Sequence, residues 1–487
     1  MNILVTGASG YIGSQLVPRL IDSGHHVVCL VRDPARLSGS IREKVEIRQG
    51  NLLDLASLSP VMQGIDIGYY LVHSMADGVY GFIERDHSAA MNFSSAISKA
   101  GLKRIIYLGG LGKCDQNLSP HLEARQNVGD ILRRSGVPVT EFRAAIIIGS
   151  GSMSFEMIRY LTERLPMLPT PPWITTLCQP IAVDNILDYL MKSLTEPIAS
   201  NAIYEIGGPD VLTYADIIRG YAQTRGLKRS LVSLPLLTTR LLAWGADILT
   251  PLPAPHLHIL IDGLRSEVVV RDPEALQMFK PQLIPYSHAV KLALNRHGSG
   301  EIESLWAGSS AGLQEGTTHK DIEGMFIEQR RTASTARPEE LYTIFESIGG
   351  KQSWYYANWL WQLRGRLDQW LGGVGMKRGR RDPDCLRPGD ILDGWRVEVM
   401  QAGRLTRLRF EMKAPGPAWL QFEAKPGKDG GSLLILTAFF EPHGLAGLFY
   451  WYFFYPFHLM IFKGLSQAIV KLAESIQWSE NLQLHPC

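Results

Sequence analysis

Three glycines near the N-terminus have the spacing of a turn that binds phosphate. Gly7, Gly10 and Gly13 follow an apolar run and open a segment with helical spacing, in the order TGASGYIG. Glycine lets the backbone turn tightly and approach a pyrophosphate closely, and the next helix points N–H groups at its charge. A purely structural turn is the alternative. We therefore predict a dinucleotide site with the cofactor-binding residues Gly7, Ser9, Gly10, Tyr11, Ile12 and Gly13.

The end of the second apolar run bears on the choice between NADP and NAD. Arg32 stands where an NAD-binding fold places an acid against the ribose 2′-hydroxyl, and an arginine there accommodates a 2′-phosphate. Asp33 follows directly and can serve NAD instead, so the pattern favours NADP with NAD as the alternative. Asn51 and Leu52 follow the next apolar segment, where a polar residue can reach an adenine edge. Asp54 fits an ordinary Asx turn almost as well.

The elements that must position these residues alternate between strand and helix patterns. Helical patterns such as 86–100 and 119–135 separate the apolar runs Ile3–Thr6, His26–Val31, Ile67–Val72, Ile105–Leu108 and Val139–Ile148. This alternation predicts an α/β fold with a doubly wound parallel sheet. From Gly149 the alternation breaks, so we expect a substrate lobe, mainly 150–180 and 204–296. Within it, Pro166–Pro172 reads as a proline-rich loop.

Composition divides the chain further. Residues 297–319 are rich in Gly and Ser and show no clear period, which is typical of a linker. We therefore expect a first domain over 1–296 and a second over 320–480.

Several motifs of the first domain resemble one known family. TGASGYIG, LVRDP, GNLLD, YYLVHSM and FRAAIIIG, with PIAVDNI and YEIGGP, resemble the short-chain dehydrogenase/reductase superfamily, in particular its atypical, NmrA-like and extended branch. The resemblance covers roughly Met1 to Arg296. It implies a Rossmann-type sheet with the nicotinamide near the carboxyl ends of the fourth and fifth strands. Leu71 and Gly109, at these ends, are therefore counted among the cofactor-binding residues.

The chain departs from the pattern of active family members. They carry a Ser or Thr after the fifth strand and a Tyr-x-x-x-Lys motif on the next helix, whereas this strand ends in Leu108-Gly109 and the motif positions hold His121 and Arg125. Positions i and i+4 share a helix face, so both side chains can face a nicotinamide ribose. Arg125 can then bind ribose hydroxyls and lower the pKa of His121, which becomes a candidate general acid. Alternatively, both belong to the solvated first turns of a helix capped by Ser119.

Other residues near the expected nicotinamide are weaker candidates for a catalytic role. His73 and Ser74 end the fourth strand and are alternative proton donors. Tyr69 and Tyr70 precede them, and core packing is the favoured interpretation of both. Asp184 falls in the segment expected to join the lobe to the sheet, and we expect it to be structural.

The second domain reads as strand, helix, several antiparallel strands and a long closing helix. That order resembles the helix-grip fold of lipid-transfer and polyketide-cyclase-like proteins, which implies a cavity for an apolar ligand. A core or domain interface is the alternative. The aromatic residues consistent with a cavity are Trp354, Tyr355, Tyr356, Trp359, Trp361, Trp395 and Trp419.

One stretch of the second domain, residues 444–465, is apolar for about the length of a membrane span. Pro456 and Gly447 interrupt it, and His458 and Lys463 are costly inside a bilayer. We therefore favour a core element that splits at Pro456 into an aromatic segment and a closing helix. Peripheral membrane contact, assisted by the basic run at 377–381, is the alternative.

Composition excludes several classes of protein. The 487 residues carry 49 Lys and Arg against 47 Asp and Glu, and this balance argues against nucleic acid as the main partner. The five cysteines form no CxxC pair, so we expect neither a metal site nor a disulfide framework. This pattern fits a cytoplasmic protein, and association with the inner face of a membrane is the alternative. The start of the chain shows no signal-peptide pattern.

These features together favour an NADP-preferring reductase that transfers hydride to a carbonyl or activated double bond of an apolar substrate. The alternative is a non-catalytic NAD(P)-binding redox sensor, or a factor that helps assemble a membrane electron-transfer complex. The oligomeric state is left open.

Overall fold

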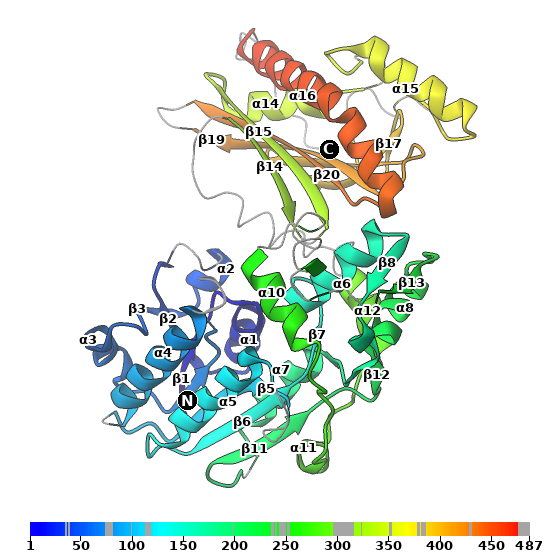
Figure 1. The fold of residues 1–487 in the computed structure, drawn as a ribbon. Coiled ribbons are helices and arrows are strands. Elements are labelled where there is room, and N and C mark those ends of the chain that lie inside the picture. The colour runs from blue at the N-terminus through cyan, green and yellow to red at the C-terminus, as the bar shows by residue number, and fades with distance from the viewer. Residues whose placement is uncertain are drawn as a thin grey trace. The chain divides into compact units, whose positions relative to one another are not determined.

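The chain forms two compact units, residues 1–311 and 312–487 (Figure 1). The computed structural model describes residues 1–34, 37, 39–73, 81–98, 100–112, 118–196, 198–234, 238, 241–242, 250, 254–295, 316–322, 324–349, 353–376, 380, 386–427 and 431–475. Strand β14 (Gly316–Ile322) begins inside the range 297–319 that the sequence assigned to a linker. The sequence of β14 is polar and shows no strand pattern, and the strand forms by pairing with β15 (Met325–Ser334).

A parallel sheet forms the centre of the first unit. Its strand order is β11-β6-β5-β4-β1-β2-β3, so the order reverses at β1, as in doubly wound sheets. The predicted α/β fold is therefore confirmed. The bounds of these strands are β1 (Asn2–Thr6), β2 (His26–Val31), β3 (Glu46–Gln49), β4 (Ile67–Tyr70), β5 (Arg104–Gly110), β6 (Val139–Ala144) and β11 (Ala202–Ile206).

Helices cover both faces of this sheet because its strands are apolar on both sides. On β1, Ile3 and Val5 pack into one buried cluster, whereas Leu4 packs into another. The first cluster contains residues of α1 (Tyr11–Asp22), α7 (Val183–Lys192) and α11 (Glu274–Phe279). The second contains residues of α3 (Leu55–Leu58), α4 (Gly81–Ile97) and α5 (Pro120–Arg133).

Two features of the lobe differ from the sequence prediction. Strand β11 pairs with β6 as a strand of the main sheet, so residues 204–206 belong to the sheet and not to the lobe. The expected loop Pro166–Pro172 contains β8 (Met167–Thr170), which pairs in parallel with β13 (Ser230–Ser233). A pair with only two strands tolerates Pro169, because a proline at a sheet edge need not donate a ladder hydrogen bond.

The remaining elements of the first unit are short and lie mostly in the lobe. They are α2 (Gly39–Arg42), η2 (Pro60–Met62), β7 (Ile147–Ile148), α6 (Met153–Arg164), η4 (Pro172–Thr175), β9 (Leu177–Cys178), β10 (Ile181–Ala182), β12 (Leu212–Thr213), α8 (Tyr214–Thr224), α10 (Ala254–Gly263) and α12 (Tyr286–Asn295).

An antiparallel sheet forms the second unit, in the order β14-β15-β20-β19-β18-β17-β16. Strands β15 and β20 pair over the whole length of β20, from Phe326 with Phe440 to Ser334 with Ser432. The predicted antiparallel sheet is confirmed, whereas the helix-grip assignment stays a prediction. The other bounds are β16 (Ile391–Leu392), β17 (Trp395–Gln401), β18 (Leu405–Phe410), β19 (Ala418–Pro426), β20 (Ser432–Phe440), α14 (Pro338–Glu346), α15 (Asn358–Trp370) and α16 (Gly444–Ser475).

Helix α16 contradicts the predicted split at Pro456, because it is continuous on both sides of that residue. Proline removes one hydrogen bond of a helix, but α16 packs against α14, β15 and β20, and these contacts support the continuous helix. Within the described residues, α16 is the helix long and apolar enough to cross a membrane by length and composition. Trp451 and Phe462 are buried, whereas Phe449 and Phe453 are 71% and 68% exposed, so only one face serves the core.

The basic run at 377–381 lies outside the described residues, except for Arg380. The Arg380 guanidinium donates a hydrogen bond to the backbone oxygen of Glu346 at 2.6 Å. This arginine therefore has a structural role within the unit.

Candidate active site

The turn between β1 and α1 has the geometry of a phosphate cradle. Gly7 adopts a left-handed φ of 74°, and its carbonyl oxygen accepts a hydrogen bond from the Gly10 N–H at 2.9 Å. A Cβ on Gly13 would lie 2.2 Å from the same oxygen, which is a severe overlap. The glycines thus let the turn close while the N-terminus of α1 stays accessible to an anion. These residues fit the pyrophosphate of a dinucleotide.

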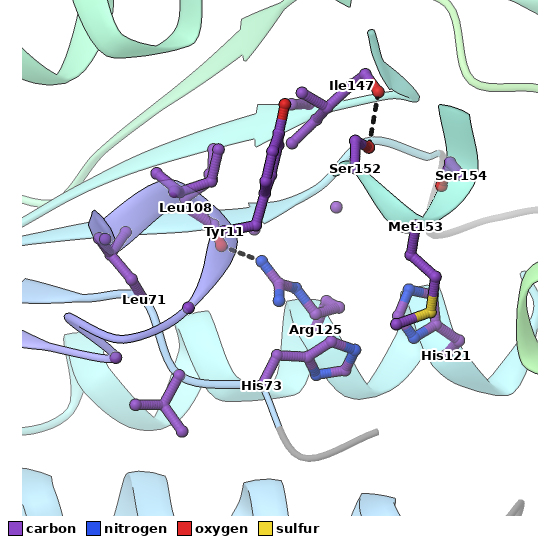
Figure 2. A pocket seen from close by; sticks show the side chains of 18 of the residues that line it. Tyr11, Leu71, His73, Leu108, His121, Arg125, Ile147, Ser152, Met153 and Ser154 are labelled. Atoms are coloured by element: carbon purple, nitrogen blue, oxygen red, sulfur yellow. Dashed lines mark hydrogen bonds between the residues drawn. The ribbon is translucent and has the colours of Figure 1, made fainter. Parts of the chain in front are cut away.

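A cavity of about 790 Å³ begins at this turn and crosses the carboxyl ends of the sheet strands toward the lobe (Figure 2). Its wall includes the apolar lobe residues Ile259, Leu260 and Leu264. The structure brings all the predicted cofactor residues to its wall, namely Gly7, Ser9, Gly10, Tyr11, Ile12, Gly13, Arg32, Asn51, Leu52, Leu71 and Gly109.

The residues expected near the adenosine have distinct positions. Arg32 is exposed and lines the cavity, whereas Asp33 does not belong to its wall. The Asn51 side chain accepts a hydrogen bond from the Leu53 N–H at 3.2 Å. Asp54 caps α3 by accepting a hydrogen bond from the Ala56 N–H, so its interpretation as an Asx turn is confirmed.

His121 and Arg125 both line the cavity from α5, as their spacing predicts. The Arg125 guanidinium donates a hydrogen bond to the backbone oxygen of Leu108 at the end of β5 (Figure 2). The Tyr107 hydroxyl donates to the backbone oxygen of Arg125 at 2.7 Å. Arg125 is therefore hydrogen-bonded to β5, the strand whose carboxyl end lies near the expected nicotinamide. Its binding of ribose hydroxyls stays a prediction.

A second histidine stands beside His121. The rings of His73 and His121 have centroids 4.8 Å apart, and Phe82 packs against both. His73 Nδ1 lies 2.6 Å from Oδ2 of Asp86, a carboxylate that is 3% exposed. This contact orients the His73 ring, as carboxylates do for catalytic and metal-bound histidines. The structure thus forms a partly buried Asp86–His73–His121 cluster, whose two histidines line the cavity.

Burial and neighbouring charges hold the pKa of His121 well below its usual value. Desolvation is the largest cause, and His73 and then Arg125 lower the pKa further, whereas Asp86 raises it. Arg125 therefore lowers the pKa of His121 as predicted, but burial lowers that pKa more. Ser119 caps the start of α5 as predicted, with its side chain accepting from the Leu122 N–H at 3.4 Å. His121 itself lines the cavity.

The other candidates are mostly structural. The buried Tyr69 donates a hydrogen bond to the backbone oxygen of Leu190 at 2.8 Å, and Tyr70 packs in the core, as predicted. Asp184 pairs with Arg19 at 2.6 Å, which ties α7 to α1 and agrees with its expected structural role. Ser74 lies outside the described residues.

Sequence reasoning missed Asp86. The sequence does predict that residues 150–155, which follow the sixth strand, face the substrate cleft. Gly151 and Ser152, just before α6, line the cavity, as do Met153 and Ser154 in its first turn (Figure 2). The Ser152 hydroxyl donates to the backbone oxygen of Ile147 at 2.8 Å. Asp86 could have been found because it stands four residues after Phe82 on α4, on the buried stripe of that helix.

Two family models match the chain. Residues 7–151 match the model described as NAD(P)H-binding. The first unit therefore contains an NAD(P)H-binding domain over these residues. Residues 324–465 match the model described as protein of unknown function DUF2867, so the fusion of such a domain to a second domain of unknown function is confirmed.

Curated relatives of this domain include both reductases and an assembly factor. The photosystem II assembly factor Ycf39 of Synechocystis is 24% identical over 244 residues, which cover 49% of this chain and 72% of that protein. The ceramide reductase of Caulobacter vibrioides is 26% identical over 256 residues, 51% of this chain and 80% of that protein. Both relatives align over about half of this chain.

Solved structures support the same fold. The triphenylmethane reductase of Citrobacter sp., complexed with NADP(H), has a TM-score of 0.50 and 19% identity, and covers 60% of this chain and 99% of its own. A nucleoside-diphosphate-sugar epimerase of Staphylococcus aureus has a TM-score of 0.50 and 18% identity, and covers 60% and 100%.

Proposed function

We propose that the first unit reduces an apolar substrate with hydride from NADPH. The observation that carries the proposal is the Asp86–His73–His121 cluster on the wall of a cavity that begins at the glycine turn. The dinucleotide supplies the hydride when it is bound. The apolar lobe residues on the wall of the cavity suit a substrate with little charge.

The chain itself must supply the proton that a reduced carbonyl oxygen requires. His121, whose lowered pKa keeps it neutral near neutral pH, can still donate a hydrogen bond to that oxygen. His73, whose ring lies beside that of His121, can return a proton to His121 after His121 has given its own to the substrate oxygen. Asp86 is the positioning residue of His73. In this proposal the histidine pair takes the place of the family's Tyr-x-x-x-Lys motif.

Removal of either histidine is expected to lower turnover about 100-fold, the usual contribution of a positioned proton donor, while NADPH affinity stays within about twofold. NADPH absorbance is followed with a long-chain aldehyde, an alkenone and a quinone as substrates, for His73→Ala and His121→Ala. His87→Ala, an exposed histidine on the same helix as Asp86, is the matched control.

Asp86→Asn separates positioning from mere support of the fold. We expect it to change the pH profile of kcat while NADPH affinity is retained, because the His73 ring loses its carboxylate partner. Full turnover in the two histidine variants would refute their role, even if the wild-type protein is an active reductase.

Arg32→Asp is expected to weaken NADPH binding on the order of 100-fold and NADH binding by threefold or less. The reason is that a guanidinium at the cavity wall can bind a 2′-phosphate, which NADH lacks. Calorimetric titration of both cofactors measures the two affinities. Equal losses for NADPH and NADH would overturn the proposed preference for NADP.

A non-catalytic role is the second candidate. In the described residues, the end of β5 is Leu108-Gly109-Gly110 without a serine, and the guanidinium of Arg125 is bonded to the backbone oxygen of Leu108. The similarity to an assembly factor adds to this alternative. Tight NADPH binding without turnover on the whole substrate panel would favour a sensor or assembly role over the reductase.

A further inference from the structure

Helix α15 of the second unit turns its apolar side away from the core. Trp359, Leu363, Leu367 and Trp370 follow one another at intervals of three or four residues, so they share one face of the helix. All four are exposed, and Trp370 is 84% exposed, whereas the carboxylate of Asp368 is fully buried. A surface helix usually places its apolar side on the core and its charges in water, so α15 has the inverted arrangement.

The buried carboxylate explains how α15 is held in this orientation. Asp368 accepts hydrogen bonds from the backbone N–H groups of Gly375 at 2.8 Å and Lys413 at 2.6 Å. The guanidinium of Arg364 lies 3.7 Å from the same carboxylate. Trp361, seven residues before Asp368 and thus on the same side of the helix, belongs to the core of the unit. These contacts fix the inner side of α15 and leave its apolar side in solvent.

The first half of α16 adds a second exposed apolar stripe. Leu363 and Leu367 of α15 line the same cavity as Phe453 and Phe457 of α16, so the two stripes adjoin each other. We call them together the apolar face. Its members are Trp359, Leu363, Leu367, Trp370 and Leu371 from α15 and its end, and Leu445, Phe449, Tyr452, Phe453, Phe457, Leu459 and Met460 from α16.

The area of the apolar face exceeds what a protein usually leaves in water. Its six aromatic side chains are between 43% and 84% exposed. At about 150–250 Å² for a whole aromatic side chain, they alone expose roughly 800 Å². The largest apolar patch of a typical soluble monomer is about 300–600 Å², and larger patches mark interaction sites. The apolar face is therefore a surface for docking.

The exposed charges along the two stripes are basic. Arg366 lies on the exposed stripe of α15, and Lys463 follows the stripe of α16. Lys413 is also exposed, and its ammonium group donates a hydrogen bond to the backbone at the end of α15 at 2.7 Å. The described residues of α15 and of the first half of α16 include one acid, the buried Asp368. Aromatic and aliphatic side chains bordered by Lys and Arg are typical of segments that bind the surface of an anionic bilayer.

The same charges disfavour a second copy of the chain as the occupant. In a symmetric dimer, the apolar face would meet the same face of the other copy. Arg366, Lys413 and Lys463 of both copies would then border one interface, and neither stripe offers an exposed acid to pair with them. Like charges across an interface lower affinity, whereas the phosphates of an anionic leaflet attract all three residues.

The inner side of α16 determines how this helix can meet a bilayer. Phe462, Leu465 and Ile469 belong to the core of the unit, and the ring of Trp451 stacks on that of Phe440, with centroids 5.6 Å apart. A helix that crossed the bilayer would remove these side chains from the core. Contact through the outer side alone keeps the core intact.

We propose that the apolar face docks on an anionic bilayer, with α15 and the first half of α16 lying along the headgroup region. The aromatic and aliphatic side chains enter the boundary between headgroups and acyl chains, and Arg366, Lys413 and Lys463 bind lipid phosphates. This contact differs from the alternative that the sequence offers, because α15 supplies part of it and because these three residues, and not the run at 377–381, supply the charge. It is independent of the proposed reductase activity of the first unit.

Docking is tested by co-sedimentation of the full chain with vesicles. One set contains phosphatidylglycerol and phosphatidylcholine, and the other contains phosphatidylcholine alone. We expect about 100-fold tighter binding to the anionic vesicles, because each of three basic residues near an anionic surface strengthens binding about fivefold. Salt at high concentration should reduce this difference, since it screens the attraction.

Two kinds of variant separate the apolar from the charged part of the contact. Trp370→Gln on α15 and Phe453→Gln on α16 should each weaken binding to both sets of vesicles about tenfold, because each removes a large side chain from the boundary region. Lys463→Glu should weaken binding to the anionic vesicles on the order of 30-fold and leave binding to phosphatidylcholine unchanged. Leu472→Gln, exposed on α16 beyond Lys463, is the matched control and should bind as the unmodified chain does. Far-ultraviolet circular dichroism checks that each variant is folded.

The proposal has three ways to fail. Equal binding to both sets of vesicles would refute the role of the basic residues, and unchanged binding in Trp370→Gln would refute the role of α15. If the chain stays in the supernatant and sedimentation equilibrium shows a dimer that Trp370→Gln dissociates, the apolar face is an interface between two copies. Finally, alkaline carbonate should release the protein from membranes of cells that produce it, and release by detergent alone would indicate a spanning helix instead.

Discussion

Gly13→Ala is expected to lower NADPH affinity on the order of 100-fold, or ~2.7 kcal/mol. The added Cβ would lie 2.2 Å from the Gly7 oxygen and 2.8 Å from the Ala8 Cα, and both are backbone atoms that cannot rotate away. The turn must therefore open, which moves the N–H groups of the phosphate cradle. Fluorescence titration with NADPH measures the loss.

The opposite end of α1 provides the matched control. Gly24 also has a positive φ, 77°, but no atom lies within 4 Å of its Cβ position. Gly24→Ala should cost about 1–2 kcal/mol of stability through backbone strain alone and leave NADPH affinity unchanged. If both variants lose affinity equally, the effect of Gly13→Ala reflects general loosening of α1 and not the phosphate cradle.

Glu141→Ala is expected to destabilise the first unit by about 3–5 kcal/mol. This carboxylate on β6 is fully buried and pairs with Arg133 from α5 and with Arg143, whose Nε lies 2.7 Å away. Its removal leaves two mostly buried guanidinium groups without their shared partner and opens a cavity next to Gly129. Urea unfolding followed by far-ultraviolet circular dichroism measures the free energy of unfolding.

Asp130→Ala is the control for that experiment, because it removes the exposed partner of the same arginine. The Asp130 side chain is 53% exposed, so its ion pair with Arg133 is screened by water and should contribute less than about 1 kcal/mol. Similar losses of unfolding free energy in Glu141→Ala and Asp130→Ala would show that burial does not decide how much an ion pair of Arg133 stabilises the unit.

The fold of the first unit could be predicted because local signals agree with one another. Strand runs, helical spacing and the glycine turn of Gly7, Gly10 and Gly13 all indicate a doubly wound sheet. Strand β14 could not be predicted, because its polar residues show no alternation and its place depends on pairing with β15. Pro456 misled for a similar reason, since packing against the sheet outweighs the local cost of a proline in α16.

The candidate site could be predicted in part. The Tyr-x-x-x-Lys positions of the resembled family pointed to His121 and Arg125, and their spacing predicted that both share a helix face. Both line the cavity. The contact between His73 and Asp86 depends on how β4 and α4 meet in space, and no spacing along the chain encodes it.

The pairing of β15 with β20 has a consequence for the order in which the second unit folds. Ser334 and Ser432 are paired neighbours in the sheet although nearly a hundred residues separate them in the chain. Loop-closure entropy makes such distant pairs form slowly and late. During synthesis the β14–β15 hairpin must therefore wait, with one edge unpaired, until β20 has emerged from the ribosome. Over that interval the second unit is the part of the nascent chain most exposed to aggregation.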